Sequence, residues 1–147
     1  IILKTQMAPG YTYRLIRPTT ARKIHQHLTE KFIDYNITPE QWVVLKTLSE
    51  QDGISQKEIS VIVEKDQNNV KAIVDKLEMK EFIIRKQNAN DKRAFSLYVT
   101  SKGNILVEEL SRLDESMLSE ISCEIKEEEI NFLYDILNKI QRNICKN

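Results

Sequence analysis

The sequence predicts a mainly α-helical protein with one small β-hairpin. Helix-breaking residues are few, with three Gly and three Pro among 147 residues. Apolar residues recur at spacings of three and four along most of the chain, which is the period of an amphipathic helix. The stretch 82–99 differs, because it contains two short strand-like runs around a polar loop. A chain of this length can bury a substantial hydrophobic core.

The first predicted helices lie between residues 11 and 52. Apolar residues recur through residues 11–35, and because Pro18 interrupts them, we expect this helix to run mainly over 19–35. Thr38-Pro39-Glu40-Gln41 is a strong helix start, with Thr as the capping residue, Pro in the first turn and Gln three positions after the cap. Asp52-Gly53 is expected to end the helix that follows.

Two short helices separated by a turn follow. Ser55-Gln56-Lys57-Glu58 has the pattern of a capping box and opens the first of them. After a turn at Glu64-Lys65, Asp66 is expected to cap a second helix that runs to about Lys80. A short helix, a brief turn and a second helix form a helix-turn-helix arrangement.

The second helix of this pair has two distinct faces. Val70, Ile73, Val74 and Leu77 form one apolar stripe. The other face carries three successive amides, together with two lysines. Amide side chains can pair with an adenine edge, and lysine suits phosphate or guanine, so this face predicts a helix that enters a DNA major groove. The plainer alternative is a solvated first turn, because Asn and Asp favour helix starts in any case. The polar residues concerned are Gln67, Asn68, Asn69, Lys71 and Lys76.

The predicted β-hairpin consists of strands over 82–86 and 94–99, joined by a polar loop over 87–93. Beside a helix-turn-helix, such a hairpin is a wing. Its basic residues can contact DNA, or they can form an ordinary charged edge that prevents sheet-to-sheet association. The charged residues of the hairpin are Arg85, Lys86, Asp91, Lys92 and Arg93.

Two further helices complete the chain, a long one that Thr100 can cap and a last one over about 127–145. Formal charge is zero overall but unevenly distributed. Residues 55–103 carry 10 basic and 7 acidic side chains, whereas residues 104–147 carry 5 basic and 10 acidic. The acidic C-terminal third is therefore not expected to contact phosphate.

The order and spacing of six short motifs resemble the MarR family of bacterial winged helix-turn-helix transcriptional regulators. The motifs are Thr-Pro-Glu-Gln-Trp-x-x-Leu (38–45), Ser-Gln-Lys-Glu-Ile (55–59), Val-Asp-Lys-Leu-Glu (74–78), Ile-Ile-Arg (83–85), Asp-Lys-Arg (91–93) and Thr-x-Lys-Gly (100–103). The resemblance covers roughly Tyr13 to Ile144. It implies a single domain over 1–147, with a DNA-binding lobe over 38–103 and dimerisation helices over 11–35 and 104–147. It also implies a two-fold homodimer on a pseudo-palindromic operator.

The resemblance assigns roles to individual positions. Gln67, Asn68, Asn69 and Lys71 are expected to face the major groove, and Arg93, oriented by Asp91, the flanking minor groove, where concentrated negative potential favours a guanidinium. Ser55 and Gln56 lie at a helix N-terminus, where backbone N–H groups can hold a phosphate. Lys76, Arg85 and Lys92 complete the expected DNA contacts. Two positions depart from the family pattern: Ala72 replaces a common polar residue, and Glu81 replaces a common Gly.

An effector pocket between the dimerisation helices and the DNA-binding lobe is also implied by ligand-responsive relatives. Its candidate residues are Tyr13, His25, Phe32 and Trp42. Core packing explains Trp42 equally well. A small-molecule effector is therefore a possible partner of this chain, alongside double-stranded DNA and a second copy.

Other chemistries have little support in the sequence. His25 and His27 point to different faces of a helix, so we expect no metal site there, and no cofactor motif is present. Cys123 and Cys145 form no CxxC pair, so we expect neither a disulfide scaffold nor a zinc site, and a reduced, cytoplasmic setting fits. Cys123 is expected to be inert and not a redox sensor. No apolar run approaches the roughly 18–20 residues of a membrane span.

Three classes of function differ in how well they fit the sequence. The leading prediction is a sequence-specific DNA-binding transcriptional regulator, a repressor that a small molecule releases from its operator. The alternative is a winged-helix module that binds another protein, as an antirepressor or adaptor, and has no specific DNA affinity. An enzyme is not expected, because the sequence has no Gly-rich phosphate loop and no recognisable catalytic arrangement.

Overall fold

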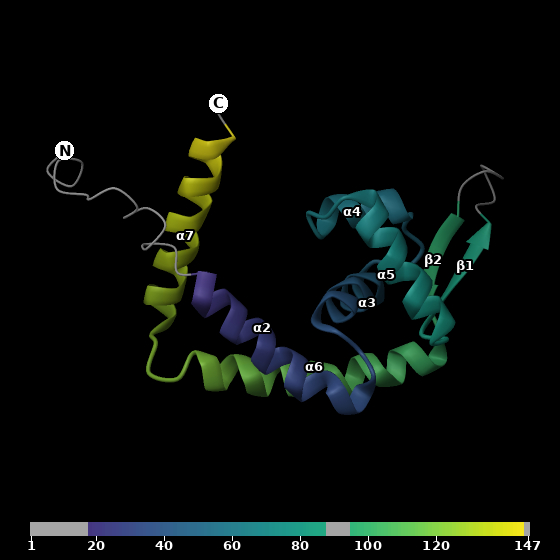
Figure 1. Cartoon of the computed structure of the whole chain (residues 1–147), viewed down its shortest axis with the longest axis horizontal. Helices are drawn as coiled ribbons and strands as arrows, with labels where there is room; N and C mark the ends of the chain where they lie inside the picture. Colours follow the sequence, from purple (N-terminus) through teal and green to yellow (C-terminus); the bar gives the residue numbers. More distant parts are fainter. Residues whose placement is uncertain (1–17, 88–94, 146–147) are drawn as a thin grey trace, which may run out of the picture. The chain divides into compact units, whose positions relative to one another are not determined.

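A computed structural model describes residues 18–87 and 95–145 (Figure 1). The chain divides into two compact units, Ile1–Glu108 and Glu109–Asn147, and the division falls inside one long helix, α6 (Ser101–Ile121). The predicted single domain over 1–147 therefore stays a prediction.

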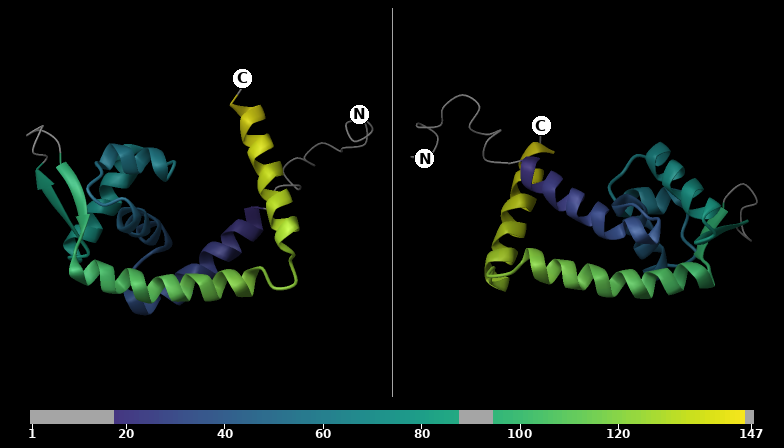
Figure 2. Two further views of the ribbon diagram at one scale, coloured as in Figure 1. Left: turned by 180° about the vertical axis from the view of Figure 1, so that it is seen from behind. Right: turned by 60° about the horizontal axis from the view of Figure 1, so that its bottom comes forward.

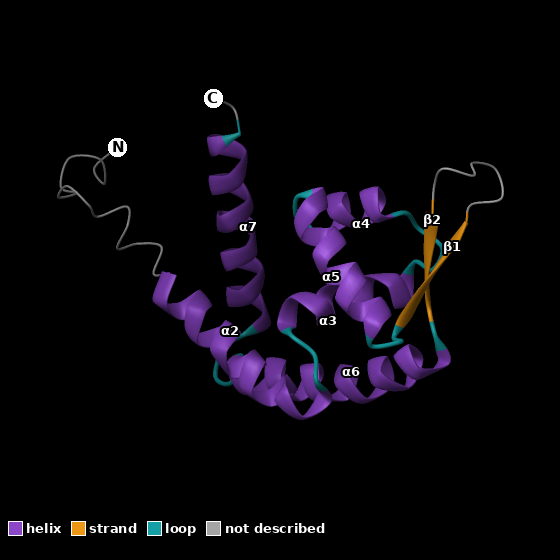
Figure 3. Ribbon diagram, turned by 45° about the vertical axis from the view of Figure 1, so that its right-hand side comes forward, coloured by secondary structure: helices purple, strands orange, loops and turns teal. Residues whose placement is uncertain are grey.

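The first unit contains the predicted helices and the hairpin. Among the described residues they are α2 (Pro18–Phe32), the 3₁₀ turn η2 (Ile33–Tyr35), α3 (Pro39–Glu50), α4 (Gln56–Ile62), α5 (Gln67–Met79), β1 (Ile83–Gln87) and β2 (Phe95–Val99). β1 and β2 are antiparallel, with Ile83 opposite Val99 and Gln87 opposite Phe95. The mainly helical class with one β-hairpin is confirmed, and Figure 3 shows the strands beside the helices of this unit.

The predicted helix starts are present as side-chain caps. The Thr38 hydroxyl accepts the backbone N–H of Gln41 at 3.3 Å, and the Gln41 side chain accepts the N–H of Thr38 at 3.4 Å. Ser55 and Glu58 form the same reciprocal pair at the start of α4. These caps satisfy N–H groups that a helix leaves without partners in its first turn.

The first described helix ends earlier than the sequence predicts. The period suggests a helix to residue 35, but α2 ends at Phe32 and tightens into η2. Asn36 then adopts a left-handed backbone, with φ of 52°, and its N–H donates to the Ile33 carbonyl at 3.1 Å. Asn tolerates this conformation better than most residues, so the chain can turn here toward α3.

The core of the first unit lies where α3, α5 and the hairpin meet. Trp42 and Leu45 contribute from α3, and the Phe32 ring meets the Trp42 ring edge-on at 6.1 Å between centroids. The apolar stripe of α5 faces this core, since Val70, Val74 and Leu77 are fully buried. The other buried apolar residues of the unit are Ile37, Val44, Leu48, Ile59, Phe82, Ile83, Leu97 and Leu106.

The connection from α5 to β1 is a tight helix end. Glu81 has a left-handed backbone with φ of 62°, its N–H donates to the Glu78 carbonyl, and the Phe82 N–H donates to the Leu77 carbonyl. This is the Schellman arrangement, which usually places Gly at the left-handed position. The buried Phe82 side chain follows it directly, so the turn delivers the chain into β1.

The start of α6 explains the Thr-x-Lys-Gly motif. The Thr100 hydroxyl accepts the Gly103 N–H at 3.0 Å, as predicted for a cap, and donates to the Glu81 carbonyl at 2.7 Å. A Cβ on Gly103 would lie 2.2 Å from the Phe82 carbonyl oxygen. Gly is therefore required here by a close approach of two backbone segments.

The second unit contains the end of α6 and α7 (Glu127–Ile144). Leu110 and Met117 of α6 are buried, but α7 has no buried residue. The apolar residues of α7 that are exposed in the single chain are Ile130, Phe132, Leu133, Tyr134, Leu137 and Ile144.

Candidate nucleic-acid interface

The α5 helix presents the polar face that the sequence predicts for base contact. Asp66 caps it, and its Oδ1 accepts the N–H groups of Asn68 and Asn69 at 3.0 and 2.9 Å. The Asn69 side chain also donates to Asp66, so its orientation is fixed from the cap. With the apolar stripe buried, the outer face is left to polar groups. Its exposed side chains are Gln67, Asn68, Asn69, Lys71 and Lys76.

The turn between α4 and α5 joins the two helices of the predicted helix-turn-helix (Figure 1). Glu64 takes a left-handed backbone with φ of 51°, and the Lys65 N–H donates to the Ser60 carbonyl at 3.1 Å. Near the N-termini of both helices, the Gln56 side chain donates to the Gln67 carbonyl at 3.2 Å. The predicted phosphate-binding end of α4 and the predicted base-reading end of α5 therefore lie together.

A hollow of about 300 Å³ lies between these helix starts and the hairpin. It brings together four residues that the sequence assigned to DNA contact, Ser55, Gln56, Gln67 and Arg85. The sequence reasoning did not single out Lys57 and Phe95, which also line it, together with Leu97. The sequence features that could have indicated them are a lysine in the first turn of α4 and an aromatic residue in a hairpin strand. Phe95 is 51% exposed.

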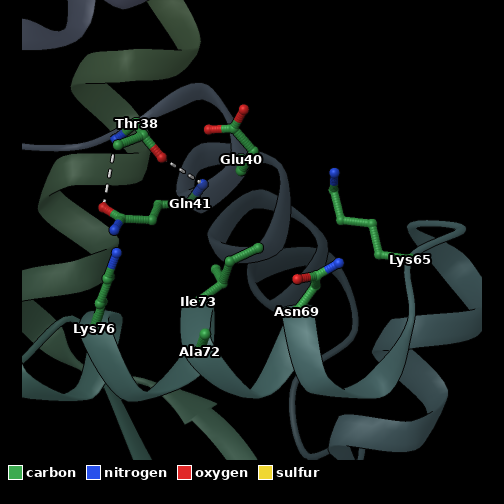
Figure 4. A pocket seen from close by; sticks show the side chains of 8 residues that line it. All are labelled: Thr38, Glu40, Gln41, Lys65, Asn69, Ala72, Ile73 and Lys76. Atoms are coloured by element: carbon green, nitrogen blue, oxygen red, sulfur yellow. Dashed lines mark hydrogen bonds between the residues drawn. The ribbon is translucent and has the colours of Figure 1, made fainter.

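A second hollow, of about 390 Å³, lies between α5 and the start of α3 (Figure 4). Figure 4 shows Asn69, Ala72 and Lys76 rising from α5 toward this space. Lys65, which the sequence reasoning placed only in a turn, adds another cation to it. Thr38, Glu40, Gln41 and Ile73 complete the lining.

Lys80 ties the end of α5 to the start of α3. Its ammonium group donates to the Asn36 carbonyl at 2.6 Å and to the Gln41 side-chain oxygen at 2.8 Å. Burial lowers the pKa of Lys80, and the nearby charge of Lys76 lowers it further. These bonds help to fix α5 in the lobe.

Arg85 was expected to contact DNA, but its guanidinium is engaged inside the lobe. It pairs with Glu78 and with Asp75, the latter at 2.5 Å between Nη2 and Oδ1. Both carboxylates come from α5. In this arrangement the cation is already neutralised, so we leave Arg85 out of the proposed DNA-contact surface.

Other wing and pocket predictions have different outcomes. Asp91, Lys92, Arg93 and Tyr13 lie outside the described residues, so their roles stay predictions. His25 of α2 bonds Glu40 of α3 at 2.6 Å. Burial raises the pKa of Glu40, but hydrogen bonds from His25, the Glu40 backbone and Thr38 together lower it below its ordinary value.

The remaining effector-pocket candidates are part of the core. Phe32 and Trp42 are 0% and 5% exposed and pack against each other. Neither of the two hollows described above is lined by them, nor by His25. The effector pocket therefore stays a prediction.

The described ranges contain neither a metal-binding cluster nor a membrane-spanning helix. Residues 18–87 and 95–145 contain no group of three or more His, Cys, Asp or Glu side chains placed to hold a metal ion. No helix in the same ranges is long and apolar enough to cross a membrane. Cys123 and Cys145 are both free and exposed.

Comparison with known proteins places this lobe in a family. The family model for MarR matches residues 37–95, which include the helix-turn-helix, β1 and the first residue of β2. A putative MarR family transcriptional regulator from Listeria monocytogenes, solved with a 26mer DNA, is 30% identical. The match covers 87% of this chain and 85% of that chain, with a TM-score of 0.76. The chain belongs to the MarR family.

Other MarR-family proteins agree over nearly the whole length. The S. aureus MepR structure, solved as a DNA complex, is 26% identical, with a TM-score of 0.79, and the match covers 95% of this chain and 99% of that one. The regulator SarZ of Staphylococcus epidermidis is 24% identical over 127 residues, 86% of this chain and 85% of SarZ. This MarR-family chain is therefore a transcriptional regulator, not an enzyme, as the sequence predicted.

Proposed function

We propose that this MarR-family regulator binds a pseudo-palindromic DNA operator as a two-fold homodimer. The observation that carries the proposal is the outer face of α5, where three successive amides and two lysines are exposed. On the opposite face, Val70, Val74 and Leu77 of the apolar stripe are fully buried. Such a face offers bidentate amide donors and acceptors to base edges and cations to phosphates. The MepR and Listeria relatives were both solved with DNA, which supports the proposal that this chain binds DNA.

In this proposal, groups next to the α5 face contact the phosphate backbone of the DNA. Ser55 and Gln56 lie at the start of α4, and the hollow beside them opens between α4, α5 and the hairpin. Lys57 lines that hollow and Lys65 lines the one next to α3, so both add positive charge near the α5 face. Phosphate contacts of this kind fix the register and orientation of the protein on the duplex, while α5 contacts the base edges that carry the sequence.

The homodimer is supported by α7. Its exposed apolar side chains would be costly in an isolated monomer, since large contiguous apolar patches mark interaction sites. A second copy places two α5 helices on one face of DNA, and two major-groove sites one helical turn apart require a separation of roughly 34–36 Å.

Repression and release by a small molecule complete the proposal. An effector that binds better to a dimer with a different lobe spacing shifts the population away from the DNA-binding state. The proposal of repression and release rests on membership of the MarR family. No pocket in the described residues is used to support it.

A DNA-binding titration tests the proposal. The purified protein is titrated against the DNA upstream of its own gene and against a scrambled duplex, at low and moderate salt. We expect a specific, salt-dependent complex with a two-fold symmetric footprint. A folded dimer that binds neither duplex at low salt would contradict the proposal and favour the protein-binding alternative.

A further inference from the structure

We infer that Arg85 is a positioning residue, which locks the hairpin to α5 and thereby sets DNA specificity without contacting DNA. The inference rests on the proposed function, because it concerns how two DNA-contacting elements are held at one angle. It replaces the DNA-contact role that the sequence assigned to Arg85.

The backbone of Arg85 faces α5 and not the partner strand. Arg85 lies opposite Leu97 in the β1–β2 register. The Leu97 N–H and carbonyl are bonded instead to Ile54 and Gly53, each at 2.9 Å. The Arg85 N–H is therefore left to the outer edge of β1, where it donates to Glu78 Oε1 of α5 at 3.3 Å.

The side chain of Arg85 repeats the connection. One guanidinium nitrogen bonds Glu78 Oε2, and another bonds Asp75 Oδ1 at 2.5 Å. Asp75 and Glu78 are three residues apart and so lie on the same face of α5. Backbone and side chain together give three hydrogen bonds from one strand residue to two helix carboxylates. The Arg85 side chain is 23% exposed, whereas those of Asp75 and Glu78 are 46% and 38% exposed. Water therefore screens both ion pairs from the carboxylate side, and the fixed geometry of the hydrogen bonds matters more here than the charge.

A planar guanidinium suits this task. It offers several donors in a rigid fork, so it can hold two carboxylates at a fixed orientation, whereas a lysine acts as a point charge. The hairpin lies beside α5 in both views of Figure 2. If both elements contact one duplex, the angle between them decides whether both sets of contacts form at once.

The two possible roles of Arg85 predict opposite effects when its partners are neutralised. The double variant Asp75→Asn/Glu78→Gln removes two negative charges from α5. If Arg85 is a phosphate contact held back by these carboxylates, the variant binds DNA more tightly. If Arg85 positions the hairpin, the variant binds its specific site more weakly despite the more favourable charge.

The experiment compares wild type, the double variant, Arg85→Gln and a matched control, Lys71→Gln. A specific site is first selected from random duplexes with the wild-type protein. Dissociation constants are then measured on that site and on a scrambled duplex at several salt concentrations. Circular dichroism and sedimentation report folding and assembly of every variant. The single variant Glu78→Gln, which keeps an acceptor for the Arg85 N–H, is included in case the double variant unfolds.

We expect the double variant and Arg85→Gln to bind the selected site about tenfold more weakly. Binding to scrambled DNA changes little, so the ratio of specific to non-specific affinity falls. The salt dependence of Arg85→Gln matches wild type, whereas Lys71→Gln has a shallower slope, because removing one phosphate interaction lowers the slope by about 0.9. A loss of folding alone weakens binding to both duplexes equally, so the ratio of specific to non-specific affinity stays unchanged.

Four results would overturn the inference. Tighter specific binding by the double variant, or a shallower salt slope for Arg85→Gln, would make Arg85 a phosphate contact. Equal losses of affinity on both duplexes would mean that Arg85 only stabilises the fold in general. If wild type selects no site at all, the proposed function fails and this inference fails with it, whereas the other three results leave the proposed function intact.

Discussion

Left-handed backbone at non-glycine residues marks several helix ends in this protein. Asn36, Glu64, Glu81 and Glu124 have φ between 51° and 64°. Left-handed backbone costs an L-residue roughly 1 kcal/mol, since its Cβ approaches the following carbonyl. At Glu81 the surrounding hydrogen bonds and the buried Phe82 hold the turn, so the chain carries this cost at the end of α5.

Replacing Glu81 with Gly is expected to stabilise the protein by about 0.5–1 kcal/mol, because Gly adopts the left-handed backbone without strain. The exposed pair between Glu81 and Lys102, at 3.2 Å, is removed but contributes little. Urea unfolding measures the change in free energy of unfolding. Glu81→Gln is the control, since it removes the charge and keeps the strained backbone. A Gly variant no more stable than the Gln variant would contradict this account.

The Arg93→Ala variant tests the wing prediction, which lies outside the described residues. If Arg93 enters a minor groove, its loss weakens DNA binding and flattens the dependence of affinity on salt, because a released counterion is no longer involved. Titrations at two or more salt concentrations measure both effects. Unchanged affinity and an unchanged slope would remove Arg93 from the interface.

At the scale of single elements, capping decides where the helices of the lobe begin. The α4 helix has only seven residues, so its own backbone hydrogen bonds stabilise it weakly. Glu58 Oε2 accepts both the N–H and the hydroxyl of Ser55, each at 2.7 Å. These hydrogen bonds lower the pKa of Glu58 below its ordinary value of 4.5. The bond from the Ser55 backbone N–H has the larger effect, followed by the bond from its hydroxyl.

The lowered pKa of Glu58 predicts a pH-dependent contribution to stability. A carboxylate whose pKa is lower in the folded state stabilises the protein above its unfolded pKa, and this contribution is lost as the pH falls below about 4.5 toward the folded value. Thermal unfolding between pH 7 and pH 3 is the measurement. The difference between wild type and Glu58→Gln should shrink at acid pH. Glu108→Gln, at an exposed position of α6, is the control for the loss of one negative charge.

At the scale of the whole molecule, the exposed apolar side chains of α7 distinguish the single chain from the proposed dimer. Leu133 and Leu137 are 57% and 46% exposed, although they lie on one stripe of a strongly amphipathic helix. On α5, by contrast, Val70, Val74 and Leu77 of the comparable stripe are fully buried within the lobe. We therefore propose that the α7 stripe forms the interface of the proposed dimer.

Leu133→Glu is expected to convert the dimer to monomer at micromolar concentrations, because it places a charge in an apolar interface. Sedimentation velocity measures the change, and DNA affinity should fall with it, since a monomer contacts one half-site. Asn131→Glu adds the same charge at another exposed position of α7 and is the matched control. A Leu133→Glu variant that remains dimeric would place the interface elsewhere.

Local patterns in the sequence determined most of the elements. The caps at Thr38, Ser55 and Asp66 were predictable because a side chain bonds a backbone group only two or three residues away. The buried stripe of α5 followed from helical spacing alone, and so did the exposed amide face opposite it. The family was predictable because the order of short motifs is itself a sequence property.

Contacts between residues distant in sequence were decided only by the tertiary structure. Nothing local to Arg85 indicates that it bonds Asp75 and Glu78 and not DNA, since a basic residue on a hairpin looks the same in either role. The close approach of Gly103 to the Phe82 carbonyl, and the bonds from Lys80 to Asn36 and Gln41, likewise join separate elements. Sequence periodicity specifies which face of a helix is apolar, but the partners of its polar groups depend on how the chain folds back on itself.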